Sequence, residues 1–298
     1  MVHDETTPIR HSSFVIRHSV VPLLGHPVAH SLSPAFQDAA FAHAGIAARY
    51  ALWDVAPGEL AAAVARLRDP GVLGANVTVP HKEAVVALLD ALTPRAARVG
   101  AVNTIVKRGD VLEGDNTDQD GFLAPLRERG LALAATRAVL LGAGGAARAV
   151  AAALLDAGVP ALTIANRTPA RAAALARDLG DPRARALGLD APALGDALAG
   201  AGLVVNATAT ATGWADDAPL DAAALDRLPP GALAYDLTYR ATPFLRAAAA
   251  RGLATLDGLP MLVEQGALAW QRWTGREPPR AAMRAAAEAA VAARDARA

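Results

Sequence analysis

The sequence predicts an α/β protein of two domains, and three observations support this fold class. Short apolar runs typical of buried strands alternate with helical segments along most of the chain, an order that indicates βαβ units and a largely parallel sheet. One of these runs leads directly into the glycine-rich segment Gly142–Gly145. The length of 298 residues suits two domains or one large domain.

The composition supports a folded protein and excludes several function classes. Hydrophobic residues make up 53% of the chain but aromatic residues only 4%, so alanine, leucine and valine must fill the core. The 29 basic and 29 acidic residues balance, which gives no support for a nucleic-acid or anionic-membrane surface. No uncharged apolar run is long enough for a membrane span. The absence of cysteine excludes disulfides and thiolate metal sites and fits a reducing compartment. We expect no metal site and a cytoplasmic location.

The first part of the chain predicts alternating strands and helices. Residues 1–18 are polar and lack a signal pattern, so we expect a disordered extension or a start site placed too early. Ser33 followed by Pro34 predicts a helix that begins with Ser33 as its N-cap and ends near residue 44. The other expected elements are strands at 20–24, 49–55 and 72–77, helices at 59–68 and 82–89, and a hairpin at 102–113.

A second series of strand–helix units begins after residue 130. The expected strands are 138–141, 161–165, 203–205 and 233–235, and the expected helices are 146–155, 169–179 and 244–251. Two further helices are expected at 261–273 and 280–296.

The glycine-rich segment has the context that a dinucleotide-binding loop requires, because it follows a strand and opens a helix. Gly142 permits the tight turn, Gly144 lets the backbone approach a pyrophosphate, and Ala147 supplies the third small residue. The helix N-terminus offers backbone N–H groups to the phosphates. The segment therefore predicts a Rossmann-type, doubly wound domain; the alternative is a glycine-rich turn that binds nothing.

The choice of cofactor is indicated one strand later, where an NAD-binding domain usually places Asp or Glu. This chain has Asn166-Arg167-Thr168-Pro169-Ala170-Arg171 there, with no carboxylate. A guanidinium group suits a 2′-phosphate because it is planar and always charged. NADP is therefore favoured over NAD, with Arg167 a better candidate than Arg171, which could be an ordinary solvated helix residue.

Lys82 and Asp118 lie in polar segments upstream of the glycine loop. A lysine and an aspartate within reach of one carbinol form a proton-transfer pair suited to hydride chemistry. Lys82 follows an expected strand, and ligands bind beyond the carboxyl ends of strands in open α/β sheets. Taken alone, however, Lys82 could be a solvated surface lysine, and Asp118 could be the N-cap of a helix at 119–129.

Ser31 and Ser33 could bind a carboxylate through their hydroxyls and the helix N-terminal amides. The simpler interpretation of Ser33 as an N-cap is compatible with this role. A zinc-binding helix is not expected at His26 and His30, because Pro27 breaks the helix and no glutamate follows His26.

Together these segments resemble the shikimate dehydrogenase family, over nearly the whole chain from about residue 20 to about residue 275. Several separate motifs occur in the same order, so the likeness is far more specific than the glycine loop alone. The motifs lie at residues 25–27, 30–34, 76–82, 100–104, 114–118, 142–148, 166–171, 206–208, 239–243 and 257–265. Gln37, Ala209 and the Arg240-Ala241 step depart from the family pattern, and none of them touches the expected catalytic pair.

The resemblance implies reversible reduction of 3-dehydroshikimate to shikimate by NADPH, a step of aromatic amino-acid biosynthesis. Lys82 and Asp118 would be the catalytic pair. The positions matching the family's substrate-binding residues are Ser31, Ser33, Thr78, Asn103, Tyr239 and Gln265. The positions matching its NADP-binding residues are Gly142, Ala143, Gly144, Gly145, Ala146, Asn166, Arg167, Thr168, Arg171 and Gly258.

The resemblance also implies the division of the chain into domains. Residues 19–117 together with 258–298 would bind the substrate, and residues 118–257 would bind NADP, so that the last helices return to the first domain. A monomer or homodimer is expected. Two alternatives stay open: a quinate/shikimate dehydrogenase of the same fold that uses NAD, and a non-catalytic NADP-binding regulatory module.

Overall fold

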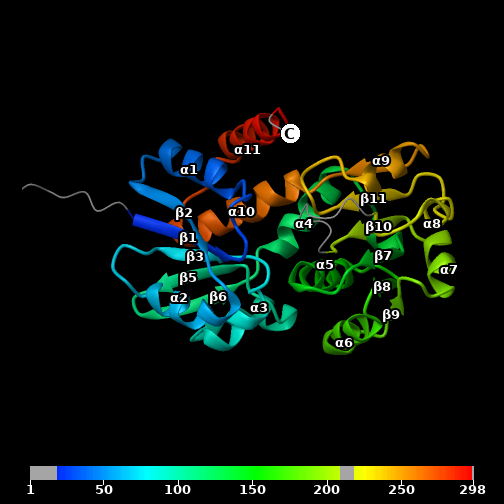
Figure 1. Ribbon diagram of the computed structural model, residues 1–298, viewed down its shortest axis with the longest axis horizontal. Helices are drawn as coiled ribbons and strands as arrows, with labels where there is room; N and C mark the ends of the chain where they lie inside the picture. The colour runs from blue at the N-terminus through cyan, green and yellow to red at the C-terminus, as the bar shows by residue number, and fades with distance from the viewer. Residues whose placement is uncertain (1–18, 209–217, 297–298) are drawn as a thin grey trace, which may run out of the picture.

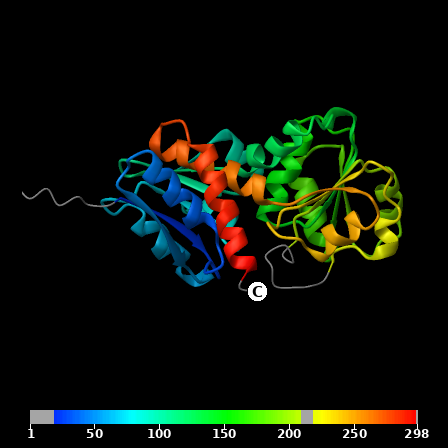
Figure 2. The same cartoon turned by 90° about the horizontal axis from the view of Figure 1, so that it is seen from above.

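The computed structural model describes residues 19–208 and 218–296, so the extension expected at residues 1–18 lies outside the described part. Two six-stranded sheets, each with helices on both faces, form two lobes that lie side by side (Figures 1 and 2). The first lobe contains strands β1 to β6, and the second contains β7 to β12. The predicted two-part α/β fold is confirmed.

The sheet of the first lobe is mixed, with the strand order β2-β1-β3-β5-β6-β4. Its strands are β1 (Ser19–Gly25), β2 (Ala48–Asp54), β3 (Gly74–Val77), β4 (Ala91–Leu92), β5 (Thr104–Arg108) and β6 (Val111–Asp115). Strands β1, β2 and β3 pair in parallel, whereas β3, β5 and β6 pair antiparallel. The expectation of a largely parallel sheet is therefore wrong for this lobe, because the predicted hairpin supplies two of its central strands.

Helices from both ends of the chain cover one face of this sheet. They are α1 (Ser33–His43), α10 (Leu259–Thr274) and α11 (Arg280–Asp295), and they bury Phe36, Phe41, Trp270 and Met283 against β1 and β2. The opposite face is covered by α2 (Leu60–Arg66), by the 3₁₀ helices η1 (Pro57–Glu59) and η2 (Ala84–Leu88), and by α3 (Pro94–Val99). Figure 1 shows α10 and α11, in orange and red, lying on the first lobe although they come last.

The sheet of the second lobe is parallel throughout, with the order β12-β11-β10-β7-β8-β9. Its strands are β7 (Ala138–Leu141), β8 (Leu162–Asn166), β9 (Ala184–Gly188), β10 (Leu203–Asn206), β11 (Leu233–Asp236) and β12 (Ala254–Leu256). The chain reverses its direction of strand addition between β7 and β10. Ligands bind at such a reversal in doubly wound sheets, and the glycine loop follows β7 at this point.

Two groups of helices enclose the second sheet. One face carries α4 (Asp118–Glu128), α5 (Gly145–Asp156) and α6 (Pro169–Leu179), and the other carries α7 (Ala193–Ala199), α8 (Ala222–Leu225) and α9 (Pro243–Ala249). A short 3₁₀ helix, η3 (Leu133–Ala135), precedes β7. Among residues 19–208 and 218–296, no helix is both long and apolar enough to cross a bilayer.

Three local predictions are wrong by small shifts. The helix expected to be capped by Ser33 begins at Ser33, and the helix that Asp118 would cap in the alternative interpretation begins at Asp118. Leu32 and Thr117 occupy the N-cap positions with nearly helical backbone angles. The helix expected at 82–89 is the five-residue η2, so Lys82 lies in the turn before it. These shifts matter for function, because they leave the side chains of Asp118 and Lys82 available for other contacts.

Candidate active site

Lys82 and Asp118 form a buried ion pair where the two lobes meet. The Lys82 Nζ donates to Asp118 Oδ2 at 2.7 Å, and the two side chains are only 14% and 4% exposed. Lys82 comes from the turn after β3, and Asp118 is the first residue of α4. A buried pair of this kind is costly to form and needs further hydrogen bonds, and the side-chain amide of Asn103 supplies one to Asp118.

Asn103 holds the second oxygen of the aspartate. Its Nδ2 donates to Asp118 Oδ1 at 2.8 Å, to Thr117 Oγ1 at 2.9 Å and to Gln265 Oε1 at 3.2 Å. Its Oδ1 accepts from the backbone N–H of Thr117 at 2.8 Å. Gln265 comes from α10, whose backbone lies so close to α4 that a Cβ at Gly121 would be 2.7 Å from Gln265 Cβ. The structure thus brings Lys82, Asp118, Asn103 and Gln265 into one cluster.

The loop before α1 forms the second part of the site. The Ser31 hydroxyl accepts from the Ser33 backbone N–H at 3.2 Å. The hydroxyl of Tyr239, which follows β11, accepts from the backbone N–H of Leu32. Burial raises the pKa of Tyr239, although Arg294 and this hydrogen bond act in the opposite direction. Tyr239 from the second lobe therefore meets the Ser31–Ser33 segment of the first.

A buried hydrogen-bond chain links the serine segment to the ion pair. The Ser33 side chain bonds to the hydroxyl of Tyr50, which in turn donates to Asn76 Oδ1 at 2.7 Å. Asn76 Nδ2 donates to the backbone carbonyl of Asn103 at 2.9 Å. Burial raises the pKa of Tyr50 well above its ordinary value, so the hydroxyl stays protonated.

Thr78 lies outside this chain of side-chain bonds in the described part of the molecule. It follows β3, and its methyl group fills the space beside Gly25, where a Cβ would overlap Thr78 Cγ2. The backbone carbonyl of Thr78 accepts from the His81 N–H at 2.9 Å, which shapes the turn that carries Lys82. Thr78 itself is half-buried.

The loop that carries Asp118 depends on the buried carboxylate of Asp115. Asp115 accepts from Thr93 Oγ1 at 2.8 Å, from Arg95 Nη2 at 3.1 Å and from its neighbour's backbone N–H at 2.8 Å. Arg272 of α10 lies 3.0 Å from the same carboxylate. Burial alone would raise the pKa of Asp115, but the bonds from Arg95 and Thr93 lower it below its ordinary value.

We expect Asp115→Asn to lower the free energy of unfolding at pH 7 by about 3 kcal/mol, because it breaks a buried charge pair. The folded-state pKa lies below the unfolded value of about 3.9. The stability that the ionised Asp115 contributes is therefore fully present above the unfolded-state pKa, and it is lost as the pH falls through the folded-state pKa. Urea unfolding of both proteins should show a difference that shrinks in acid. A difference that stays constant with pH would contradict the prediction.

The glycine loop has the geometry expected for a bound pyrophosphate. Gly142 has a φ of +113°, which side-chain-bearing residues rarely adopt, and a Cβ there would lie 2.7 Å from the carbonyl oxygen of Ala207. A Cβ at Gly144 would meet nothing within 4 Å, so the backbone there borders open space. At Gly145 a Cβ would lie 2.9 Å from Lys82 Cβ. The loop therefore touches the catalytic candidate directly.

The residues expected to select NADP surround the start of α6. Arg167 and Arg171 are exposed, and neither guanidinium has an ion pair or hydrogen bond within residues 19–208 and 218–296. Asn166 Nδ2 donates to the carbonyl of Thr168 at 3.0 Å and shapes the turn between them. These free cations fit a phosphate group.

Gly258 is buried against Leu237, where a side chain would overlap the backbone, and its N–H donates to Thr238 O at 2.9 Å.

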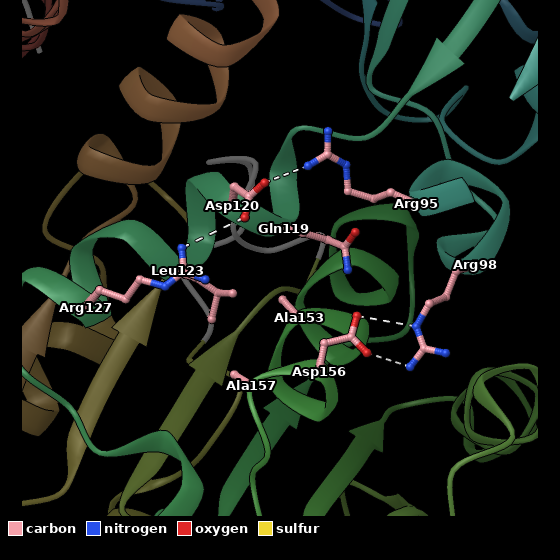
Figure 3. Close-up of a pocket in the computed structure, with 9 residues that line it drawn as sticks. All are labelled: Arg95, Arg98, Gln119, Asp120, Leu123, Arg127, Ala153, Asp156 and Ala157. Atoms are coloured by element: carbon pink, nitrogen blue, oxygen red, sulfur yellow. Dashed lines mark hydrogen bonds and ion pairs between the residues drawn. The ribbon is translucent and has the colours of Figure 1, made fainter. Parts of the chain in front are cut away.

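A cavity of about 270 Å³ lies between α3 and α4 on one side and α5 on the other. Figure 3 shows Arg98 of α3 paired with Asp156 of α5, and Arg95 paired with Asp120. The N···O distance is 2.6 Å in both pairs. None of the predicted site residues lines this cavity, although Gln119 follows Asp118 in the chain. Among the described residues, no group of three or more His, Cys, Asp or Glu side chains could hold a metal ion.

Sequence reasoning gave no role to several residues that the structure brings to the site. Tyr50 and Thr117 bond to predicted residues but lie in stretches whose pattern indicates only a strand and a turn. Arg148 belongs to a family-like motif, but no role was expected for it. Thr117 and Arg148 could have been found from their position in the sequence, because each lies within three residues of a predicted site residue.

A doubly wound lobe whose glycine loop touches a buried lysine–aspartate pair defines a two-lobed, dinucleotide-dependent oxidoreductase. Three family models match this chain: the shikimate dehydrogenase substrate-binding domain at residues 23–105, shikimate / quinate 5-dehydrogenase at 126–238, and the shikimate 5'-dehydrogenase C-terminal domain at 258–288. The chain belongs to the shikimate dehydrogenase family.

Individual relatives agree with this assignment. Shikimate dehydrogenase (NADP(+)) of Symbiobacterium thermophilum is 51% identical, over 91% of this chain and 94% of the relative. The crystal structure of shikimate 5-dehydrogenase from Thermus thermophilus, in complex with NADP(H) and shikimate, is 43% identical with a TM-score of 0.81, covering 91% of this chain and 99% of that one. Quinate dehydrogenase from Corynebacterium glutamicum in complex with NAD is 32% identical with a TM-score of 0.79, covering 90% and 98%.

Proposed function

We propose that this protein catalyses the reversible NADPH-dependent reduction of 3-dehydroshikimate to shikimate. The observation that carries the proposal is the buried Lys82–Asp118 ion pair, whose lysine packs directly on the glycine loop. This contact supports the assignment of Lys82 as a proton donor beside the proposed dinucleotide site. The similarity to shikimate dehydrogenase (NADP(+)) proteins along most of the chain supports the choice of substrate.

The side chains around the ion pair are suited to hold a polyhydroxylated acid. Ser31 and Ser33 offer hydroxyls at the start of α1, where a carboxylate is favoured by the helix dipole. Ring hydroxyls would bond to Thr78, Asn103 and Gln265. Tyr239, which already bonds to Leu32 across the lobes, would border the same space.

The proton is assigned to Lys82. NADPH, when bound, supplies the hydride that reaches the C3 carbonyl carbon. Lys82 donates a proton from Nζ to the carbonyl oxygen in the same step, so that the C=O bond becomes CH–OH. Asp118 accepts a hydrogen bond from Lys82, stabilises its ammonium form before transfer and fixes its direction; in the reverse reaction Lys82 accepts the proton.

Cofactor selection is assigned to the free guanidiniums of Arg167 and Arg171, which would bind the 2′-phosphate of NADP. We also propose that residues 118–257 form the NADP-binding domain and that residues 19–117 with 258–298 form the substrate domain. A cytoplasmic location and a monomeric or homodimeric state remain predictions.

The test is a rate measurement with purified protein, following NADPH or NADH absorbance for shikimate and quinate with NADP and NAD in all four combinations. We expect turnover with shikimate and NADP far above the other three. Preference for quinate or NAD would replace this proposal with the broader dehydrogenase. Binding of NADP without turnover of either acid would leave a non-catalytic binding module.

A further inference from the structure

Arg148 is a largely buried cation that joins the two lobes. It lies in the first turn of α5, its side chain is 15% exposed, and a cation there gains nothing from the helix dipole. Two carboxylates hold the guanidinium instead. Its Nε donates to Glu83 Oε2 at 3.2 Å, and its Nη2 donates to Asp178 Oδ2 at 2.8 Å. Glu83 belongs to the first lobe, whereas Asp178 belongs to α6 of the second.

Glu83 directly follows Lys82, and both residues contact α5. The Lys82 side chain crosses α5 at Gly145, where a Cβ would lie 2.9 Å from Lys82 Cβ and 3.3 Å from Lys82 Cδ. Positions 145 and 148 are three residues apart and so lie on the same face of the helix. The 82–83 segment is therefore attached at two points on one helix, by packing at Gly145 and by the ion pair at Arg148.

The contacts of Arg148 with Glu83 and Asp178 are expected to add little to the stability of the fold. The Glu83 and Asp178 side chains are 43% and 46% exposed, and ion pairs with carboxylates this exposed contribute little. The contacts are better explained by what they hold in place. The helix that carries Arg148 begins within the glycine loop, so the ion pair fixes the spacing between the loop and the backbone that carries Lys82.

We propose that Arg148 is a positioning residue, which acts through Glu83 to hold Lys82 in register with a dinucleotide bound at the glycine loop. The proposal rests on the proposed function for the role of Lys82. Misplacement of a reacting group by about 1 Å costs about 100-fold in rate. Loss of the ion pair therefore affects turnover more than binding.

The first test compares Arg148→Met and Glu83→Gln with the wild type. We expect each variant to lower kcat about 10- to 100-fold and to leave the dissociation constant of NADP nearly unchanged. The double variant should lose no more than either single variant, because both break one interaction. Arg148→Lys should recover part of the loss. The solvent deuterium isotope effect on kcat should rise, because proton transfer becomes more rate-limiting.

Two control variants separate positioning from general attachment of the lobes. Asp178→Asn removes the other partner of Arg148 without touching the segment of Lys82. Arg98→Met removes the separate Arg98–Asp156 pair that also joins the lobes (Figure 3). Arg98→Met should keep kcat near the wild-type value, and Asp178→Asn should lose far less than Arg148→Met because Arg148 keeps its bond to Glu83. Equal losses in the controls, a near-normal kcat in Arg148→Met, or a loss confined to NADP affinity would each overturn the proposal.

A second measurement does not depend on turnover, and so distinguishes failure of this proposal from failure of the proposed function. Hydrogen exchange of the purified protein is followed with and without NADP. We expect NADP to slow exchange at residues 81–86 in the wild type, and this protection to disappear in Arg148→Met while NADP still binds. Equal protection in both proteins, or none in the wild type, would overturn the coupling whatever the substrate.

Discussion

Lys82→Ala is expected to lower kcat by about 10²- to 10⁴-fold, the usual contribution of a positioned acid–base group. The substitution removes the group assigned to donate the proton and leaves Asp118 with Asn103 as its hydrogen-bond donor. Lys82→Arg should lose almost as much, because an arginine keeps the charge but does not release its proton. Steady-state rates with shikimate and NADP, together with a direct NADP binding measurement, test both variants.

The chain offers a matched control, since Lys107 is its only other lysine. Lys107 Nζ donates to the backbone carbonyls of Arg68 and Asp69, at 2.8 and 2.7 Å. We expect Lys107→Ala to keep kcat near the wild-type value even if it loses some stability. Near-normal turnover in Lys82→Ala would refute the assignment of the proton donor.

The double substitution Arg167→Ala/Arg171→Ala is expected to raise the KM for NADP by about 100-fold or more. A hydrogen bond to a charged group contributes about 1.5–3 kcal/mol, and each 1.4 kcal/mol is about tenfold in affinity. The KM for NAD should change little, because NAD lacks the 2′-phosphate. The ratio of kcat/KM for the two cofactors measures this effect.

Arg177→Ala is the control for cofactor selection, because Arg177 is exposed at the far end of the same helix, α6. It should leave the cofactor ratio unchanged. A double variant that loses NADP and NAD equally would show that the arginines act on the shape of the loop and not on the phosphate.

The second lobe was the more predictable half of the fold. Strands β7, β8, β10 and β11 are mostly apolar runs between helices, and such runs are typical of parallel strands buried on both faces. The edge strands β9 and β12 were missed, as was the two-residue β4, because an edge strand or a very short one need not be apolar. The mixed strand order of the first sheet depends on which strand the predicted hairpin pairs with. No local sequence pattern indicates that pairing.

The site was predictable by residue but not by geometry. Lys82 and Asp118 are 36 positions apart, and their contact depends on β5 and β6 returning the chain past β3. Each residue taken alone indicated a surface lysine or a helix cap. Their pairing was a chemical hypothesis that the resemblance to a family strengthened. The Arg148–Glu83 contact was not expected, because charged residues at helix starts usually face solvent.

The placement of α10 and α11 has a consequence for the order in which the protein is made. The apolar face formed by Phe36, Phe41 and Tyr50 is covered by residues 263–287, which leave the ribosome after the entire second lobe. The first lobe to be synthesised is therefore the last to complete its core. Until then its exposed face needs protection from aggregation, and the second lobe is free to fold around its own sheet.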